Sequence, residues 1–331
     1  MQKLGNEFNI LFTSAGRRVS LIRSFRSALD AIGLTGKLVA ADMRNSAPAA
    51  FVADLQEEVP QVSDATYVLR LQEICRRHDI KLLVPLIDTE LHLLAPHRAE
   101  FAQMGVTLLV SSGEACEICH DKRKTGEFFR SIGIKTPATL DPGTILADPH
   151  ANYPFLLKPA TGSCSVGVNK INNPAELEFF MKYVSDPIVQ ELVGGQEYTL
   201  DILVDFAGKV RSVVPRLRME TRAGEVSKGL TVKNQAIIEA GRLVAASLPG
   251  AIGCITAQCF LTADQEIVFF EINPRFGGGV PLSIEAGADF PRWIIEMMLH
   301  TYQERPIDDW RDNLAMLRYD EGIFVSGDLV W

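Results

Sequence analysis

A carboxylate, an amide and a guanidinium stand close together at the end of one predicted strand. The string E-I-N-P-R, Glu271 to Arg275, follows the apolar run Val268 to Phe270. Because side chains alternate along a strand, Glu271 and Asn273 are expected on the same side. Their oxygens suit Mg²⁺, and the planar fork of Arg275 suits a phosphate or a carboxylate. The spacing therefore indicates a cation site beside an anionic ligand, and the alternative is an ordinary polar turn.

A neighbouring strand supplies a third oxygen donor. Cys254 to Leu261 and Glu266 to Glu271 have the pattern of two hairpin strands, with Ala263 to Gln265 at the turn. In that pairing Gln258 shares a face with Glu271. The hairpin therefore predicts a cation platform of three oxygen-bearing side chains.

A possible phosphate-binding loop lies earlier in the chain. Pro154 to Pro159 reads as an apolar strand that carries Lys158, and Thr161 to Val168 follows as T-G-S-C-S-V-G-V. Small residues let backbone N–H groups surround a phosphate, and the lysine would neutralise its charge. The loop lacks the G-K-[ST] of a Walker A sequence. A plain hairpin turn is the alternative interpretation.

The first hundred residues have the pattern of a doubly wound α/β sheet. Phe8 to Thr13 and Leu38 to Ala41 read as strands, and Val19 to Leu29 between them reads as an amphipathic helix. The dinucleotide fingerprint G-x-G-x-x-G is missing from the first loop. Asp42, at the end of the second strand, lies about where a ribose-binding acid would lie. Because the glycines are missing, a local cap or a substrate contact is the favoured interpretation of Asp42.

Two acids follow a later strand of the same domain. Lys81 to Pro85 is the strand, and Asp88 and Glu90 lie in the P-L-I-D-T-E segment at its carboxyl end. Ligands bind at such ends in open α/β sheets, so both acids are candidate substrate contacts. Glu90 could equally cap the helix that follows.

The second part of the chain is predicted as a mixture of helices and strands. Glu114 to Ile132 reads as one helix carrying the basic run Asp121 to Lys124, and the tail ends in a predicted strand, Ile323 to Val325. The Arg- and Gly-rich stretch Pro215 to Gly229 is expected to be a mobile basic loop facing an anionic site, or else a merely solvated loop. Its candidate substrate contacts are Arg216, Arg218 and Arg222.

Composition restricts the class of protein. The chain has 331 residues, 47% of them hydrophobic and 22% charged, with a net charge of −8. This balance argues against nucleic acid or an anionic membrane as the main partner. Of the six cysteines, only Cys116 and Cys119 form a C-x-x-C, and no second pair completes a zinc site, so reduced thiols are expected. Without a signal-peptide core or an apolar run of membrane-spanning length, the expected location is the cytoplasm.

Taken in order, these features resemble the ATP-grasp superfamily, and within it a single synthetase half of the carbamoyl phosphate synthase large subunit. The resemblance covers nearly the whole chain, and E-I-N-P-R with Gln258 upstream is its most specific part. It implies a mixed α/β and α+β architecture. A Rossmann-like pre-ATP-grasp domain would span residues 1–111. An ATP-grasp domain would follow over 112–331, with a small lid subdomain over roughly 150–193.

The same resemblance assigns roles residue by residue. Lys122 and Lys158 would hold the phosphates of ATP, Glu197 would bind the ribose, and Lys158 and Arg275 would stabilise the transferring phosphoryl group. The metal ligands for Mg²⁺ or Mn²⁺ would be Gln258, Glu271 and Asn273. The remaining ATP contacts would come from a closing loop and an adenine-reading hinge: Thr161, Gly162, Ser163, Ser165, Gly167, Gln190, Glu191, Leu192 and Val193.

The implied function is an ATP- and Mg-dependent ligase that joins a carboxylate to an amine or ammonia through an acyl phosphate. Its partners would be small molecules, and a homodimer is one assembly the resemblance allows. The chain has room for only one synthetase half and no visible glutaminase. A bicarbonate-phosphorylating component of a split carbamoyl phosphate synthase is therefore one alternative, and a non-catalytic nucleotide-binding regulator is another.

Overall fold

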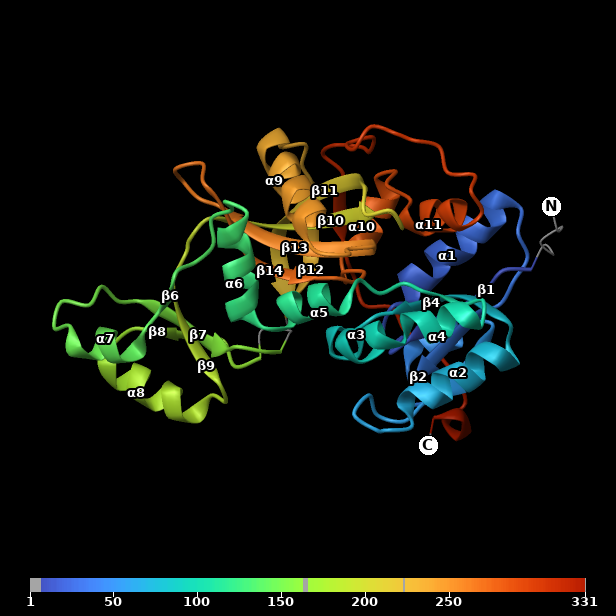
Figure 1. The fold of residues 1–331 in the computed structure, drawn as a ribbon, viewed down its shortest axis with the longest axis horizontal. Helices are drawn as coiled ribbons and strands as arrows, with labels where there is room; N and C mark the ends of the chain where they lie inside the picture. The colour runs from blue at the N-terminus through green and yellow to red at the C-terminus, as the bar shows by residue number, and fades with distance from the viewer. Residues whose placement is uncertain (1–6, 163–165, 223, 331) are drawn as a thin grey trace.

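The computed structural model describes residues 7–162, 166–222 and 224–330. Ser163 and Ser165 of the predicted phosphate loop lie outside these residues. The described strands form three sheets, which follow one another along the long axis of the molecule in Figure 1. The parallel sheet lies on the right of that view, the large antiparallel sheet in the centre and the small antiparallel sheet on the left.

The amino-terminal sheet is parallel and doubly wound. Its strand order is β3-β2-β1-β4-β5, so the order reverses between β1 and β4. All five residues of β1 are buried, as expected of a strand covered on both faces. The elements are β1 (Asn9–Thr13), α1 (Val19–Ile32), β2 (Leu38–Asp42), β3 (Leu55–Glu58), α2 (Tyr67–Arg77), β4 (Ile80–Pro85), α3 (Asp88–Leu94), α4 (Arg98–Gln103) and β5 (Thr107–Leu108).

The predicted single helix Glu114 to Ile132 is wrong, because the structure divides it in two. Helix α5 (Gly113–His120) ends before Asp121, and α6 (Lys122–Ser131) begins after it. Asp121 has an extended backbone (φ −103°, ψ 117°), and its side chain accepts a hydrogen bond from the Arg123 backbone N–H. An aspartate that caps a helix in this way competes with continuation of the preceding one. The break places Lys122 at the first turn of α6.

The small antiparallel sheet has the order β6-β9-β7-β8. It has its own apolar core, which includes Leu157, Ile171, Leu177 and Val189. Its elements are β6 (Thr139–Leu140), α7 (Pro142–Ala147), β7 (Phe155–Pro159), β8 (Asn169–Ile171), α8 (Pro174–Tyr183) and β9 (Pro187–Glu191). The candidate phosphate loop joins the paired strands β7 and β8.

The large antiparallel sheet has the order β14-β13-β10-β11-β12-β15. Phe276, just after E-I-N-P-R, packs edge-on against Phe25 of α1 with ring centres 5.8 Å apart, so this turn is fixed against the parallel domain. The elements are β10 (Gln196–Val204), β11 (Val210–Arg222), β12 (Glu225–Thr231), α9 (Gln235–Ser247), β13 (Gly253–Leu261), β14 (Ile267–Asn273), α10 (Val280–Glu285), α11 (Phe290–Met298) and β15 (Ala315–Leu317).

Two further predictions in this region are wrong. The stretch Pro215 to Gly229 is not a mobile loop, since most of it belongs to the paired strands β11 and β12. Ile323 to Val325 is not a strand; the edge of β12 pairs instead with β15. In both cases pairing across the sheet decided the structure, and charge or local apolar character did not.

No helix among the described residues is both long enough and apolar enough to cross a membrane. The cysteines in that part of the chain, including Cys116 and Cys119, are free thiols.

Candidate active site

The three oxygen donors predicted for the cation platform share one face of a hairpin. Gln258 of β13 lies directly opposite Glu271 of β14, and Thr256 lies opposite Asn273. The Asn273 side-chain amide donates a hydrogen bond to Glu271 Oε1 at 3.1 Å. The hairpin and the shared face agree with the sequence prediction, and the metal-binding role of these residues stays a prediction.

A β-bulge changes which aromatic side chain stands beside the platform. Gln258 pairs with Glu271 but Cys259 pairs with Phe269, so Phe270 is the extra residue on β14. Strict alternation would turn Phe270 away from Glu271. Instead both residues line the same cavity, and Phe270 stacks on Phe260 with ring centres 4.7 Å apart.

That cavity has a volume of about 260 Å³ and lies between the small sheet and the β13–β14 hairpin. Most of the residues that the sequence assigns to a nucleotide meet here. The predicted site residues in its wall are Lys122, Lys158, Gly162, Gln190, Glu191, Leu192, Val193, Glu197 and Glu271. Thr161, Gly167, Gln258, Asn273 and Arg275 are not in the wall. Thr161 and Gly167 neighbour lining residues in the chain, Gln258 pairs with Glu271, and Asn273 donates a hydrogen bond to Glu271.

Two lysines give the cavity a buried positive end. The Lys122 ammonium donates to the Gly162 carbonyl at 2.9 Å, and Lys158 is only 6% exposed. Burial, reinforced by the charge of Lys122 and opposed by Glu271, lowers the pKa of Lys158 to about 8. Lys158 forms no ion pair with a described residue. A buried ammonium without a carboxylate partner is suited to an anionic ligand.

Other groups in the cavity could contact an uncharged part of the ligand. Gln190 is buried and donates through its amide to Thr139, while its Oε1 has no hydrogen-bond partner among the described residues. Glu197 pairs with Arg218 at 2.9 Å. Burial raises the pKa of Glu197, and Arg218 opposes that shift. A free acceptor and a carboxylate in one apolar cavity could bind an amino group and hydroxyl groups.

Arg275 points toward the parallel domain. Its Nη2 donates to Asp88 Oδ2 at 2.7 Å and its Nε donates to the same oxygen at 3.2 Å. Burial alone would lower the pKa of Arg275, but Asp88 and Glu271 keep it above its usual value. Asp88 is therefore close to the platform, as a candidate substrate-site residue should be.

Two predicted substrate contacts are wrong, because their side chains are buried in other interactions. Glu90 is fully buried, accepts hydrogen bonds from Tyr67, Ser14 and the Leu86 and Ile87 N–H groups, and caps α3. Arg216 is 1% exposed and pairs with Asp201 at 2.7 Å. Asp42 accepts from the Gly16 N–H at 2.8 Å, so it is a local cap.

Of the three candidate arginines on β11, Arg218 alone reaches the cavity, through Glu197. Arg222 is exposed and pairs with Asp320 at 2.7 Å. Its role as a substrate contact has no support from this geometry.

Several lining residues escaped the sequence analysis. Phe260 lies two residues after Gln258 on the same strand face, so alternation could have found it. Phe270 depends on the bulge and could not have been found in this way. The other lining residues without an assigned role are apolar: Pro137, Leu156, Pro159, Val166 and Val168.

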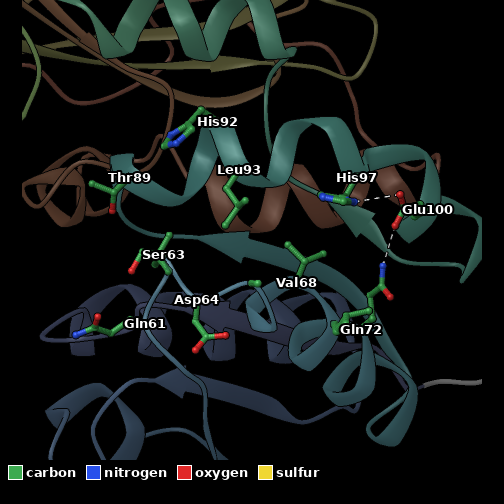
Figure 2. Close-up of a pocket in the computed structure, with 13 residues that line it drawn as sticks. Gln61, Ser63, Asp64, Val68, Gln72, Thr89, His92, Leu93, His97 and Glu100 are labelled. Atoms are coloured by element: carbon green, nitrogen blue, oxygen red, sulfur yellow. Dashed lines mark hydrogen bonds and ion pairs between the residues drawn. The ribbon is translucent and has the colours of Figure 1, made fainter.

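A larger cavity of about 670 Å³ lies within the parallel domain, between the segment before α2, α2 itself and α3 (Figure 2). His97, Glu100 and Gln72 form a hydrogen-bonded row along one side of it, with distances of 3.1 and 3.0 Å. None of the residues that line it is lysine or arginine. It is therefore poorly suited to a triphosphate, and the smaller cavity is the better candidate.

The residues described contain no cluster of three or more His, Cys, Asp or Glu side chains placed to hold a metal ion. The platform has one carboxylate and two amides instead. This donor set fits Mg²⁺, which takes few protein ligands and completes its shell with phosphate oxygens and water.

Comparisons with known proteins agree with this architecture. Residues 10–109 match the family model "PylC-like, N-terminal domain", and residues 184–319 match "ATP-grasp in the biosynthetic pathway with Ter operon". A biotin carboxylase from Campylobacter jejuni, solved with β,γ-ATP, has a similar fold, with a TM-score of 0.71 and 16% identity over 93% of this chain and 74% of that one.

Two curated relatives are D-alanine–D-alanine ligases. The one from Marinomonas sp. is 35% identical over 29% of this chain and 33% of its own length. The one from Fusobacterium nucleatum is 27% identical over 49% of this chain and 58% of its own length. The chain therefore covers less than two thirds of either relative.

The chain is therefore similar to ATP-grasp proteins over residues 184–319 and shares its fold with solved enzymes of that kind. The matches do not single out the carbamoyl phosphate synthases.

Proposed function

We propose that the chain is an ATP- and Mg²⁺-dependent ligase that joins a carboxylate to an amine or ammonia through an acyl phosphate. The observation that carries this proposal is the position of Glu271. It lies opposite Gln258 in the hairpin and in the wall of the cavity that holds Lys122 and Lys158. The Glu271 carboxylate of the predicted platform, the buried Lys158 and the half-buried Lys122 thus line one cavity. That combination suits a triphosphate better than any uncharged ligand.

The reaction has two steps. An oxygen of the substrate carboxylate attacks the γ-phosphorus of ATP, the bond to the β-phosphate oxygen breaks, and ADP leaves. The amine then attacks the carbonyl carbon of the acyl phosphate, the C–O bond to phosphate breaks, and the amine loses a proton as the amide forms. No covalent bond to the protein is required.

The residues of the chain act by position and charge. Lys122 and Lys158 would bind phosphate oxygens, and Arg275 would stabilise charge on the transferring phosphoryl group. Gln258, Glu271 and Asn273 would hold Mg²⁺, which supplies charge neutralisation and alignment of the phosphates. Gln190 and Glu197 would contact the adenine and ribose. Thr161, Gly162 and Gly167 belong to the loop that would close over the phosphates and exclude water from the acyl phosphate.

Two other functions would use the same cavity. The first is that of a component of a split carbamoyl phosphate synthase. In that case bicarbonate is the acid that is phosphorylated, and a second synthetase chain is the partner. This function predicts ATP hydrolysis that depends on bicarbonate. A nucleotide-binding regulator would bind ATP without turnover on any acid and amine. The named ligase relatives favour the ligase.

A phosphate-release screen with Mg·ATP and pairs of acids and amines tests the proposal. Glu271→Gln removes the carboxylate but keeps the size of the side chain, and it should abolish substrate-dependent release. Glu266→Gln is the matched control, because Glu266 lies at the other end of the same hairpin and is about half exposed. Full activity in Glu271→Gln would contradict the metal assignment. Tight ATP binding with no release across the screen would favour the regulator.

A further inference from the structure

The point where the strand order of the parallel sheet reverses, called the crevice below, contributes no residue to the wall of the nucleotide cavity. The strand order reverses between β1 and β4, so the loops after these two strands diverge at their carboxyl ends. Open α/β sheets bind ligands at such a point. Here the loop after β1 carries Arg17 and Arg18, and the loop after β4 leads to Asp88.

Arg18 lies across this crevice. Its Nη2 donates to the Leu86 carbonyl at 3.4 Å, which joins the two loops. Its Nη1 approaches Gly278, at 3.3 Å from the position that a Cβ would take there. Arg18 therefore lies between the parallel domain and the G-G-G turn that follows Arg275. It is partly exposed and so remains open to a ligand.

The charges around Arg18 do not balance. Asp88 is held by Arg275 at 2.7 Å. Glu225 is held by Arg318 at 3.2 Å and by Arg17 at 3.8 Å. Arg18 itself forms no ion pair with a described residue. Arg17, Arg18, Arg275 and Arg318 thus lie around Asp88 and Glu225. The exposed Asp320, which pairs with Arg222, is a third acid that acts on Arg17 and Arg318.

The electrostatics agree with this geometry. Burial, together with the positive charge of Arg275, lowers the pKa of Arg18 to about 10, and Glu225 and Asp88 only partly oppose this. A guanidinium kept in such surroundings gains most from an added anion that accepts two parallel hydrogen bonds.

Resting on the proposed ligase function, we propose that Arg18 binds a second anionic group of an organic substrate, distinct from the carboxylate that is phosphorylated. The substrate class is then an acid–amine pair in which one member carries an extra carboxylate or phosphate. The anionic group would lie on the crevice side of Arg275, and the nucleotide on the lysine side. The second anionic group belongs either to the amine acceptor or to the acid donor.

The experiment compares matched substrates on the full-length protein. Amino acids are tested against their uncharged amides as acceptors, and dicarboxylic acids against their monocarboxylic analogues as donors. In the wild type, one of the two charged sets should be preferred, and which one identifies the source. Arg18→Gln should raise the KM for that charged substrate about 10- to 100-fold, the range for a hydrogen bond to a charged group. The KM for Mg·ATP and for the uncharged analogue should stay unchanged.

Arg23→Gln is the matched control, because Arg23 is exposed on α1, the helix that begins directly after Arg18. Arg18→Lys keeps the charge and should restore part of the affinity, and thermal unfolding verifies that each variant folds. Equal KM values for charged and uncharged substrates, or an unchanged KM in a folded Arg18→Gln, would overturn the inference while leaving the ligase function intact.

Failure of the ligase function gives a different result, namely no substrate-dependent phosphate release in the wild type. Calorimetric titration with succinate and with inorganic phosphate then probes the crevice directly. Binding that is lost in Arg18→Gln and kept in Arg23→Gln supports an anion site. Binding that is absent, or the same in both variants, rejects it.

Discussion

Asp88 and Arg275 join the parallel domain to the turn after β14, beside the predicted cation platform. They are 187 positions apart in the chain, and one oxygen of Asp88 accepts hydrogen bonds from two nitrogens of Arg275, at 2.7 and 3.2 Å. Asp88 begins α3 of the parallel domain, and Arg275 follows the metal-binding candidates of β14. The orientation of the Arg275 side chain therefore depends on a residue of the parallel domain.

We expect Asp88→Asn to reduce kcat/KM by roughly 10- to 100-fold, because it removes a charge-assisted hydrogen bond that orients Arg275. Steady-state kinetics of phosphate release measures this effect. The control is Asp79→Asn, an exposed acid that pairs only with the nearby Lys81. Equal kinetics in the two variants would show that Arg275 does not need Asp88.

The charged Lys158 is expected to lower the stability of the fold and to raise the affinity for nucleotide. Its pKa is about 8 in the folded protein and 10.5 ordinarily. Between these pH values the unfolded chain binds more protons, so the contribution of Lys158 to the free energy of unfolding rises with pH across this window. Below pH 8 the folded protein must hold a buried charge. The difference between the pKa values of Lys158 in the folded and unfolded protein corresponds to at most roughly 3 kcal/mol in the free energy of unfolding.

Lys158→Met should therefore raise the Tm at pH 7 and nearly abolish nucleotide binding. Calorimetric unfolding and ATP titration provide the two measurements. Lys124→Met serves as the control, since Lys124 is exposed and pairs with Glu117. A lower Tm for Lys158→Met at pH 7 would show that the charged lysine stabilises the fold. In the wild type, affinity for Mg·ATP should fall as the pH rises above about 8.

The buried Gln190 should recognise the base of the nucleotide. Its free Oε1 can accept a hydrogen bond from the amino group of adenine, which guanine lacks at the corresponding position. Gln190→Leu should weaken ATP binding by about 10-fold, as expected for one lost hydrogen bond in an apolar site. It should also reduce the preference for ATP over GTP. Competition titrations measure both quantities, and an unchanged preference would assign base recognition to the backbone of the following residues.

Gly279 should not tolerate a side chain. A Cβ at this position would lie 2.3 Å from Arg216 Nη1 and 2.6 Å from Val226, although the backbone φ of −96° is ordinary. Gly279→Ala should lower the free energy of unfolding by about 1–3 kcal/mol through overpacking. Gly113→Ala is the control, because nothing lies within 4 Å of its added Cβ. Denaturant unfolding compares the two variants, and equal stability would mean that the buried Arg216–Asp201 pair can shift without cost.

Much of the fold could be predicted because its signals are local. The alternation before Glu271, the turn after Leu261 and the apolar runs of β1 and β2 each lie within a few residues. They identified the hairpin, the shared face of Gln258 and Glu271, and the doubly wound sheet, but not the bulge at Phe270. Local signals failed where pairing partners lie far away. Pro215 to Gly229 is rich in charge and glycine, yet it forms strands because β10 and β15 complete the sheet on its two sides.

The sequence by itself determined the chemistry available to this protein: the oxygen donors of E-I-N-P-R, the strand-end lysine and the small-residue loop. The tertiary structure decided which of the remaining charges can meet a ligand. Arg216 is buried against Asp201, Glu90 caps a helix, and Arg18 lies free in the crevice beside Arg275. The nearby sequence offered the capping role of Glu90 as one of two interpretations, but it does not distinguish Arg216 from Arg18. Burial and pairing depend on segments up to 187 positions away, which come together only when the sheets pack.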